Sequence, residues 1–257
     1  MVKKRLDLVL TERGLAESRS RAQSLIMEGL VTAGGRRDLK AGSLVDEEID
    51  LQVEQPLPYV GRGALKLETA LDGFGIDPNG RTALDIGSST GGFTDLLLQR
   101  GASRVIDVDV TISQLHYRLM KDPRVLKVEK NARYLEKEDL QGLVPSLVVM
   151  DLSFISVLKV LPAVKPLAPK ADYLVLVKPQ FEGRREWLHK GIVRDAGHRE
   201  EILLGTAEGV KSLGLFLKGV LPSTIKGQKG NQEYLFYMVD GGEGTPVSEE
   251  RLREVAK

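Results

Sequence analysis

Seven short apolar segments recur through residues 62–257, and most are separated by stretches with helical periodicity. The apolar segments are residues 82–86, 104–109, 124–128, 147–151, 173–178, 215–220 and 234–239, and the helical stretches are residues 62–74, 92–100, 112–120, 155–165 and 198–213. Apolar strands that alternate with helices are typical of a doubly wound α/β fold, in which helices cover both faces of the sheet. The last two segments are joined by a loop too short for a crossover helix, so we expect them to pair antiparallel. The pattern predicts a seven-stranded, mostly parallel sheet.

The first 58 residues follow a different pattern, which predicts a separate, smaller domain. Residues 1–40 carry nine basic and five acidic side chains, whereas residues 41–60 carry five acidic and no basic ones. Apolar side chains on both sides of Ser18, a candidate N-cap, predict two helices, and the short apolar runs that follow predict strands. The prolines of Gln55-Pro-Leu-Pro58 predict an extended connector. We therefore expect a small α+β domain over residues 1–58 and the sheet domain over residues 59–257.

Composition narrows the class of protein. The chain has 257 residues, of which 42% are hydrophobic and 28% charged, with a net charge of +1 and a mean hydropathy of −0.14. These values are typical of a globular protein. The absence of cysteine excludes disulfides, zinc-thiolate sites and cysteine nucleophiles. Because there is no signal-peptide pattern and no apolar run of the roughly 18 residues that a membrane span needs, we expect a cytoplasmic protein without a membrane partner.

A glycine-rich loop follows the first strand of the sheet domain. Ligands bind at the carboxyl ends of parallel strands, where a turn of small residues lets the backbone approach them. The loop is neither a G-x-G-x-x-G fingerprint nor a phosphate-binding loop. It resembles the S-adenosylmethionine loop of Rossmann-like methyltransferases, with glycines that clear space for the methionine moiety and Asp85 as an acceptor for its ammonium group, directly or through water. The candidate cofactor residues in this loop are Asp85, Gly87, Ser88, Ser89, Thr90, Gly91, Gly92 and Phe93.

A second acidic residue at the end of the next strand, Asp109, is a candidate ligand of the cofactor's ribose hydroxyls. A lone glycine-rich loop is also compatible with an ordinary strand–helix turn beside surface acids. Asp109 lies at the end of the next strand, where recognition of a ribose requires an acceptor. Its position therefore favours a cofactor site over an ordinary strand–helix turn.

Ten short motifs, in order along the chain, resemble the TlyA/hemolysin A family. In the sheet domain they are Arg62-Gly-Ala-Leu-Lys66-Leu-Glu, Asp85 to Asp95, Asp122-Pro-Arg-Val125, Asn131-Ala-Arg133, Asp151-Leu-Ser-Phe-Ile-Ser156, Lys178-Pro-Gln-Phe-Glu182 and Gly230-Asn-Gln-Glu233-Tyr. In the N-terminal region they are Arg5-Leu-Asp7, Ser18-Arg-Ser-Arg-Ala22 and Ile26-Met-Glu-Gly29-Leu-Val31. That family joins an RNA-binding domain of the type found in ribosomal protein S-four to an FtsJ-like methyltransferase. The chain departs from the family pattern at Thr111 and at Gly34-Gly35.

The resemblance implies ribose 2′-O-methylation of ribosomal RNA, free or in ribosomal subunits, with S-adenosylmethionine as methyl donor. The catalytic Lys-Asp-Lys-Glu tetrad of FtsJ-like enzymes corresponds here to Lys66, Asp151, Lys178 and Glu233, and Asn131 joins the cofactor residues. The strand pattern supports two of these positions independently, because Asp151 and Lys178 each end an apolar strand at the predicted ligand edge. The sequence assigns neither a target nucleotide nor an oligomeric state.

The chemistry of the tetrad follows from the weakness of a ribose hydroxyl as a nucleophile. A side chain of the enzyme must take the proton of this hydroxyl or stabilise the alkoxide that develops as it reacts. A free lysine has a pKa of about 10.4, so a lysine serves as a base only where burial or a neighbouring cation lowers that pKa. Lys66 is the expected neighbouring cation for Lys178, and Asp151 and Glu233 are expected to orient the two ammonium groups.

Basic residues in two regions are candidate RNA contacts. Lys4, Arg5, Arg19 and Arg21 are expected on the two N-terminal helices, where they would neutralise phosphates. Arg184 and Arg185 lie in a segment that also holds Trp187, the only tryptophan. Two interpretations of this segment stay open: a lid in which Trp187 stacks on a base of the RNA, or a loop that Trp187 packs internally.

Two other functions compete with methyl transfer. The family name records haemolysis, which would make the chain a membrane-active protein, but no long amphipathic basic helix is present. A non-catalytic RNA-binding assembly factor is the other alternative. The three histidines have no metal-ligand spacing, so no metal site is expected.

Overall fold

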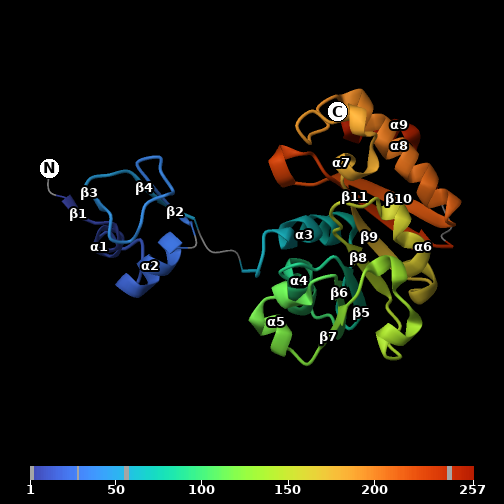
Figure 1. Cartoon of the computed structure of the whole chain (residues 1–257), viewed down its shortest axis with the longest axis horizontal. Helices are drawn as coiled ribbons and strands as arrows, with labels where there is room; N and C mark the ends of the chain where they lie inside the picture. Colours follow the sequence, from blue (N-terminus) through green and yellow to red (C-terminus); the bar gives the residue numbers. More distant parts are fainter. Residues whose placement is uncertain (1–2, 28, 55–57, 242–244) are drawn as a thin grey trace. The chain divides into compact units, whose positions relative to one another are not determined.

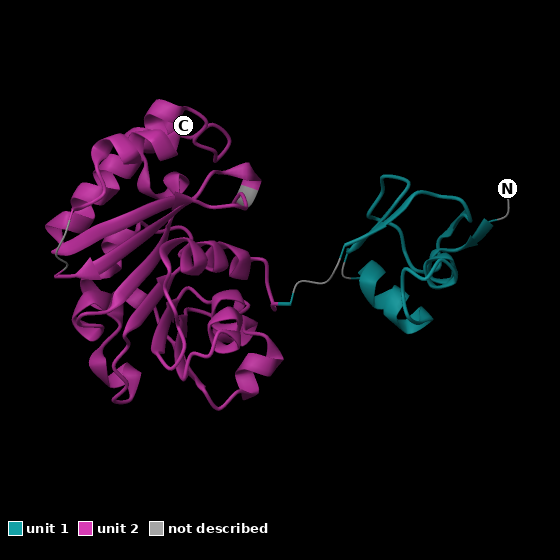
Figure 2. Cartoon of the chain, turned by 180° about the vertical axis from the view of Figure 1, so that it is seen from behind, with its two compact units in different colours: residues 1–58 teal, residues 59–257 magenta. Residues whose placement is uncertain are grey.

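The computed structural model describes residues 3–27, 29–54, 58–241 and 245–257, apart from the side chain of residue 228. The chain divides into two compact units, residues 1–58 and residues 59–257 (Figure 2). Most of the predicted proline connector, residues 55–57, lies outside the described residues. No helix in the described ranges is long and apolar enough to cross a membrane.

The N-terminal unit is a small α+β structure around its own core. Its elements are β1 (Lys3–Arg5), α1 (Leu6–Glu12), α2 (Arg19–Met27), β2 (Val31–Ala33), β3 (Leu44–Asp46) and β4 (Leu51–Val53). β1 pairs antiparallel with β3, and β2 pairs antiparallel with β4. The predicted N-cap is confirmed, because the Ser18 hydroxyl accepts a hydrogen bond from the Arg21 amide at 3.2 Å. Leu6 and Leu10 of α1 and Ala22 and Leu25 of α2 are buried in the core.

The second unit contains the predicted seven-stranded sheet (Figure 1). Its strands are β5 (Thr82–Ile86), β6 (Arg104–Asp109), β7 (Val125–Glu129), β8 (Leu147–Met150), β9 (Asp172–Val177), β10 (Leu215–Pro222) and β11 (Tyr234–Asp240). They lie in the order β10-β11-β9-β8-β5-β6-β7. All neighbours from β9 to β7 pair in parallel, whereas β11 pairs antiparallel with both β9 and β10. The mostly parallel sheet and its antiparallel last pair are therefore confirmed.

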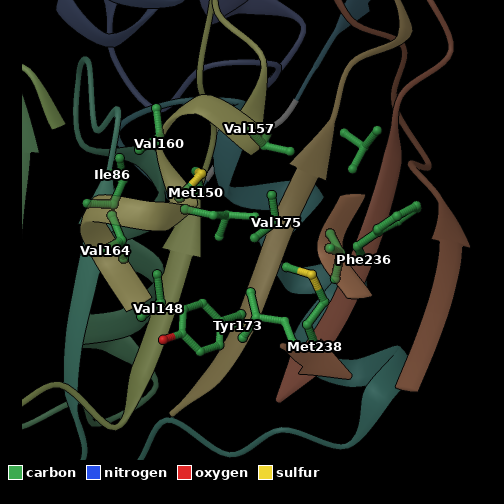
Figure 3. Close-up of a cluster of buried hydrophobic side chains, with 14 of the residues drawn as sticks. Ile86, Val148, Met150, Val157, Val160, Val164, Tyr173, Val175, Phe236 and Met238 are labelled. Atoms are coloured by element: carbon green, nitrogen blue, oxygen red, sulfur yellow. The ribbon is translucent and has the colours of Figure 1, made fainter. Parts of the chain in front are cut away.

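Alternate strand residues face opposite sides of the sheet, and each side is covered by helices. α3 (Gly63–Phe74) and α4 (Gly92–Gln99) cover the side toward which Ala83 of β5 points. α6 (Leu161–Val164), α8 (Ala196–Ser212) and α9 (Glu249–Ala256) cover the other side, toward which Leu84 and Ile86 point. Figure 3 shows part of this second core, with Tyr173 and Val175 of β9 beside Phe236 and Met238 of β11. Asp85, between Leu84 and Ile86, therefore faces α4.

Two predicted helices are shorter than expected. Residues 112–120 form a 3₁₀ turn at 112–114 and then α5 (Tyr117–Lys121), because extended His116 caps α5 by accepting from the Arg118 amide at 3.3 Å. Residues 155–165 contain only a 3₁₀ turn and the single turn α6, with a further 3₁₀ turn at 165–167. Pro162 and Pro166 lack amide donors, which prevents one continuous helix. α7 (Pro179–Glu182) is a further single turn after β9.

Candidate active site

Two cavities meet at the carboxyl edge of the parallel strands. The first has a volume of about 810 Å³ and lies over the glycine-rich loop, the end of β6 and the segment after β8. The second has a volume of about 510 Å³ and lies between the start of α3, the end of β9 and the segment before β11. The residues that line both cavities are Gly87, Ser89, Asp151, Ser153 and Phe181.

The second cavity brings together the four predicted tetrad residues, which come from four separate segments of the chain. The Lys66 Nζ lies 2.6 Å from Oε2 of Glu233 and 3.9 Å from Oδ2 of Asp151. The Lys178 Nζ lies 2.5 Å from Oδ1 of Asp151. Lys66, Lys178 and Glu233 are buried, with 9%, 7% and 1% of their surfaces exposed. Two cations and two anions thus alternate in one chain of contacts, and Asp151 links the two lysines.

The sheet explains why these residues meet. Asp151 and Lys178 directly follow the neighbouring parallel strands β8 and β9, so both emerge at the same edge. Glu233 directly precedes β11, and the antiparallel pairing of Tyr234 with Val177 places Glu233 one step further, opposite Lys178. Lys66 reaches the same point from the second turn of α3.

Tight packing holds the Glu233 carboxylate toward Lys66. Gly227 lies against this carboxylate so closely that a Cβ atom added at Gly227 would overlap its atoms. The Ser223 amide also donates to the Glu233 carbonyl at 2.8 Å, which fixes the backbone there. A side chain at residue 227 would therefore displace the carboxylate that pairs with Lys66.

The glycine-rich loop is shaped by contacts with the segment after β8. Gly87 has a φ of +84°, and a Cβ atom there would lie 2.6 Å from the Asp151 carbonyl oxygen. The glycine therefore lets the loop approach the backbone of Asp151, and Gly87 also lines both cavities, so its predicted role beside the cofactor stays a prediction. Gly91, with a φ of +92°, is needed because a side chain would overlap Leu115 and Leu119, and it lines neither cavity.

Asp109, predicted to contact the cofactor's ribose, and Asn131, predicted as a further cofactor residue, line the first cavity. The Asp109 carboxylate accepts from the Ser89 amide at 2.9 Å and from the Thr111 amide at 3.0 Å. Thr111 makes this contact through its backbone, so the departure from the family pattern leaves it intact. The Asn131 side chain accepts from the Arg133 amide at 3.1 Å, which fixes its position at the cavity wall. Ser88, Thr90, Gly92 and Phe93 line the second cavity instead.

Asp85 lies behind the loop rather than in it. Its side chain is fully buried and lines neither cavity, so its predicted contact with the cofactor's ammonium group, directly or through water, stays a prediction. The Thr94 hydroxyl contacts Asp85 at 2.7 Å and Asp107 at 3.0 Å, and Asp107 also accepts from the Ser88 hydroxyl. Because Thr94 has a single hydroxyl proton, one of the two carboxyl groups must itself donate in this arrangement.

The electrostatics of this buried pair agree with that proton count. Burial raises the pKa of Asp107 to about 6. Burial and, to a lesser extent, the charge of Asp107 raise the pKa of Asp85 well above its ordinary value. Both carboxyl groups therefore ionise less readily than free aspartates, and the pair fixes Ser88 and the start of α4 from behind the loop.

The N-terminal cations surround one buried acid. Asp7 accepts from Arg5 at 3.0 and 2.9 Å, from Arg19 at 3.0 Å and from Gln23 at 2.8 Å. These hydrogen bonds, above all those from Arg5, hold the pKa of Asp7 well below its ordinary value. Two guanidinium groups share one carboxylate, so the cluster keeps a net positive charge at the surface of the unit.

The other two N-terminal cations differ from this pair. Lys4 pairs with Glu12 at 2.8 Å and with Glu47 at 3.3 Å. Arg21 forms no ion pair within the described residues. The expectation that all four cations lie on helices is wrong for Lys4 and Arg5, which belong to β1, because pairing with β3 keeps the chain extended until α1 begins.

The segment after α7 is packed internally. The Trp187 ring stacks on His198, with ring centres 4.7 Å apart and planes 10° apart, and the Arg184 guanidinium lies 5.2 Å from the Trp187 ring centre. The structure thus shows the packing alternative for Trp187. Arg184 and Arg185 remain exposed.

Several residues that line the cavities were not predicted as site residues. Lys178 donates to the Ser153 hydroxyl at 3.3 Å, and its Nζ lies 6.0 Å from the centre of the Phe181 ring. Phe154 is 83% exposed with a φ of +66°, and its ring packs against Phe181 at 5.3 Å. Ser153 and Phe154 could have been predicted as site residues from the sequence, because both lie in the Asp151–Ser156 motif. Nothing in the sequence singles out Gly227.

Comparison with known proteins identifies the family. The FtsJ-like methyltransferase model matches residues 59–239, and the S4 domain model matches residues 4–48. The chain belongs to the FtsJ-like methyltransferase family. The sequence is 43% identical to the 16S/23S rRNA (cytidine-2′-O)-methyltransferase TlyA of Mycobacterium tuberculosis, over 91% of this chain and 89% of that protein. It is 40% identical to Hemolysin A of Brachyspira hyodysenteriae, over 91% and 99% of the two chains.

One solved structure aligns with the whole length of this chain. It is described as "Putative hemolysin from Streptococcus thermophilus", and it aligns with a TM-score of 0.78 and 37% identity over 100% of this chain and 95% of that one. The resemblance drawn from the motifs is therefore confirmed, as is the methyltransferase fold with an N-terminal S4 domain.

Proposed function

We propose that this FtsJ-like methyltransferase transfers the methyl group of S-adenosylmethionine to a ribose 2′-hydroxyl of ribosomal RNA. The observation that carries the proposal is the Lys66–Glu233 and Lys178–Asp151 arrangement, in a cavity that opens onto the glycine-rich loop. Relatives named for rRNA cytidine-2′-O-methylation support the same substrate class.

The first cavity fits the nucleoside part of the cofactor. Asp109 supplies a carboxylate whose remaining lone pairs suit ribose hydroxyls, and Asn131 lies on the same wall. Gly87 and Ser89, which line both cavities, would adjoin the methionine part. When bound, the cofactor supplies an electrophilic methyl group on a sulfonium. Asp85 acts on this site indirectly, by fixing the loop through Thr94 and Asp107.

The second cavity would hold the target ribose. Lys178 takes the hydroxyl proton or, as an ammonium group, stabilises the developing alkoxide, while Asp151 orients its Nζ. Lys66, held by Glu233, adds a second positive charge on the other side of Asp151. A positioned base typically contributes about 10²–10⁴-fold, whereas correct orientation of the two reactants contributes roughly 7–11 kcal/mol, so orientation is the larger effect.

The N-terminal S4 unit would bind the RNA and hold it near this cavity. Arg5 and Arg19 are pre-oriented by Asp7, and Arg21 has no competing ion pair within the described part of the chain. Such contacts to phosphates give affinity and orientation without sequence choice. A ribosomal substrate would also support a cytoplasmic location for the protein.

The test is a methylation reaction with the purified full-length chain, isotopically labelled S-adenosylmethionine and either free rRNA or ribosomal subunits. The RNA is digested to nucleosides, and the labelled products are identified by mass spectrometry. We expect label only in a 2′-O-methylated nucleoside. Label on a base, or no label on either substrate, would contradict the proposal.

A further inference from the structure

A third cavity of about 570 Å³ lies beside the active site and is lined by cations without an acid. Arg194, Arg199 and Lys226 line it, with Lys257 next to them, and no aspartate or glutamate is among its lining residues in the described structure. Cavities with one sign of charge attract ions of the opposite sign strongly, because the protein walls screen the charges less than water does.

The cations of this cavity are held without aspartate or glutamate partners among the described residues. Arg199 donates to main-chain oxygens of Arg194, Ala256 and Lys257 at 2.8, 2.9 and 3.1 Å. These bonds fix the plane of its guanidinium. Neither Arg194 nor Lys226 has an ion pair among the described residues.

The floor of the cavity contains a buried tyrosine. Tyr234 is fully buried and lines the cavity. The Arg199 side chain interacts with the Tyr234 hydroxyl and so opposes the rise in the pKa of Tyr234 that burial causes. Tyr234 therefore helps to hold the Arg199 guanidinium at this cavity.

This cavity adjoins the catalytic one. Tyr234 directly follows Glu233, and alternate residues of a strand point to opposite sides of the sheet. Glu233 therefore points toward Lys66 of α3, while Tyr234 points into the core on the side of α8. Lys226 lines both the second and the third cavity, so the two sites share a wall.

We propose that the third cavity binds a backbone phosphate of the RNA substrate close to the target ribose. The inference rests on the proposed function and adds a subsite to it. Guanidinium and ammonium groups are the donors that recognise phosphate, and Arg194 and Lys226 have no ion pair among the described residues. In RNA each ribose is flanked by phosphodiesters, so an anion site that shares a wall with the ribose cavity meets the substrate's own backbone.

The test compares Arg194→Gln with Lys170→Gln in equilibrium binding of the full-length chain to an rRNA fragment at several salt concentrations. Both changes remove one exposed cation, but Lys170 precedes β9 and so lies at the opposite edge of the sheet. We expect Arg194→Gln to weaken binding about three- to tenfold at 0.1 M salt and to reduce the slope of log affinity against log salt by about 0.7–1. Lys170→Gln should change neither quantity.

Two outcomes would overturn the inference: unchanged affinity and slope in Arg194→Gln, or equal losses in both variants. A methylation assay on the same proteins separates this result from the proposed function. Full methyl transfer with no dependence on Arg194 rejects the phosphate site alone. Binding that depends on Arg194 without any methyl transfer rejects the proposed function and leaves the phosphate site standing.

Discussion

Gly227→Ala targets the Lys66–Glu233 ion pair, because the added methyl group meets the Glu233 carboxylate first. All three of the nearest atoms to a Cβ at residue 227 belong to that side chain. The carboxylate must move by more than about 1 Å to reach an ordinary contact distance of about 3.5 Å. The backbone of Gly227 is not in the left-handed region, so alanine adds no strain of its own.

The size of the effect follows from the burial of the pair. The 2.6 Å contact between Lys66 and Glu233 joins side chains that are 11% and 2% exposed, so solvent screens it little. The loss of a hydrogen bond between charged groups costs about 1.5–3 kcal/mol. We therefore expect the melting temperature of the methyltransferase unit to fall by roughly 4–8 °C. If Glu233 orients Lys66 in the reaction, the same loss lowers kcat by about 10- to 100-fold.

The assay is thermal unfolding followed by turnover at saturating RNA and cofactor, with Gly205→Ala as the matched control. Gly205 lies in α8, and no neighbouring atom lies within 4 Å of the position that an alanine methyl group would take, so alanine there should stabilise the helix by up to about 1 kcal/mol. Wild-type turnover and melting temperature in Gly227→Ala would refute the reasoning, because the ion pair would then be irrelevant to both.

Three further changes test other parts of the structure. Gly87→Ala places a methyl group 2.6 Å from the Asp151 carbonyl at a φ of +84°, so calorimetry should show at least tenfold weaker S-adenosylmethionine binding, about 1.4 kcal/mol; unchanged affinity would remove Gly87 from the site. Deletion of residues 1–58 should leave a unit that binds the cofactor but loses rRNA methylation, and full methylation by the truncated chain would argue against RNA binding by the S4 domain. Because the pKa of Asp107 is raised to about 6 in the folded state, its stabilising contribution is present below about pH 4 and is lost as the pH rises through 6. The unfolding free energy of wild type minus that of Asp107→Asn should therefore fall by up to about 3 kcal/mol between pH 4 and pH 7, as measured by denaturant titration, and a flat difference would show that Asp107 does not titrate in this range.

The sheet and two members of the tetrad could be predicted because they depend on local pattern. Continuous apolar runs identify buried parallel strands, and residues that end such strands emerge at one edge, which places Asp151 and Lys178 together. Lys66 and Glu233 followed from the family motifs, and the structure supplies the physical reason for Glu233 through the antiparallel register of β11 with β9.

The misplaced residues depend on contacts that the sequence pattern does not contain. The burial of Asp85 behind the loop was not predicted, because strand alternation with Leu84 and Ile86 turns it toward Thr94 of α4. Arg5 was expected on a helix, but a three-residue strand is too short to show a period, and its pairing with β3 is a long-range contact. The third cavity is lined by residues from the segments 192–199, 222–234 and 255–257, so no single sequence motif predicts it.

Turnover by Lys178→Ala tests the central claim most directly. The variant removes the group closest to Asp151, while Lys66 at 3.9 Å remains to balance that charge, so the fold and the glycine-rich loop should persist. At saturating rRNA and S-adenosylmethionine we predict a loss in kcat of at least about 100-fold, with both affinities within about threefold of wild type and no rescue by Lys178→Arg. Turnover of Lys178→Ala equal to that of wild type would contradict the account, because methyl transfer would then proceed without the tetrad.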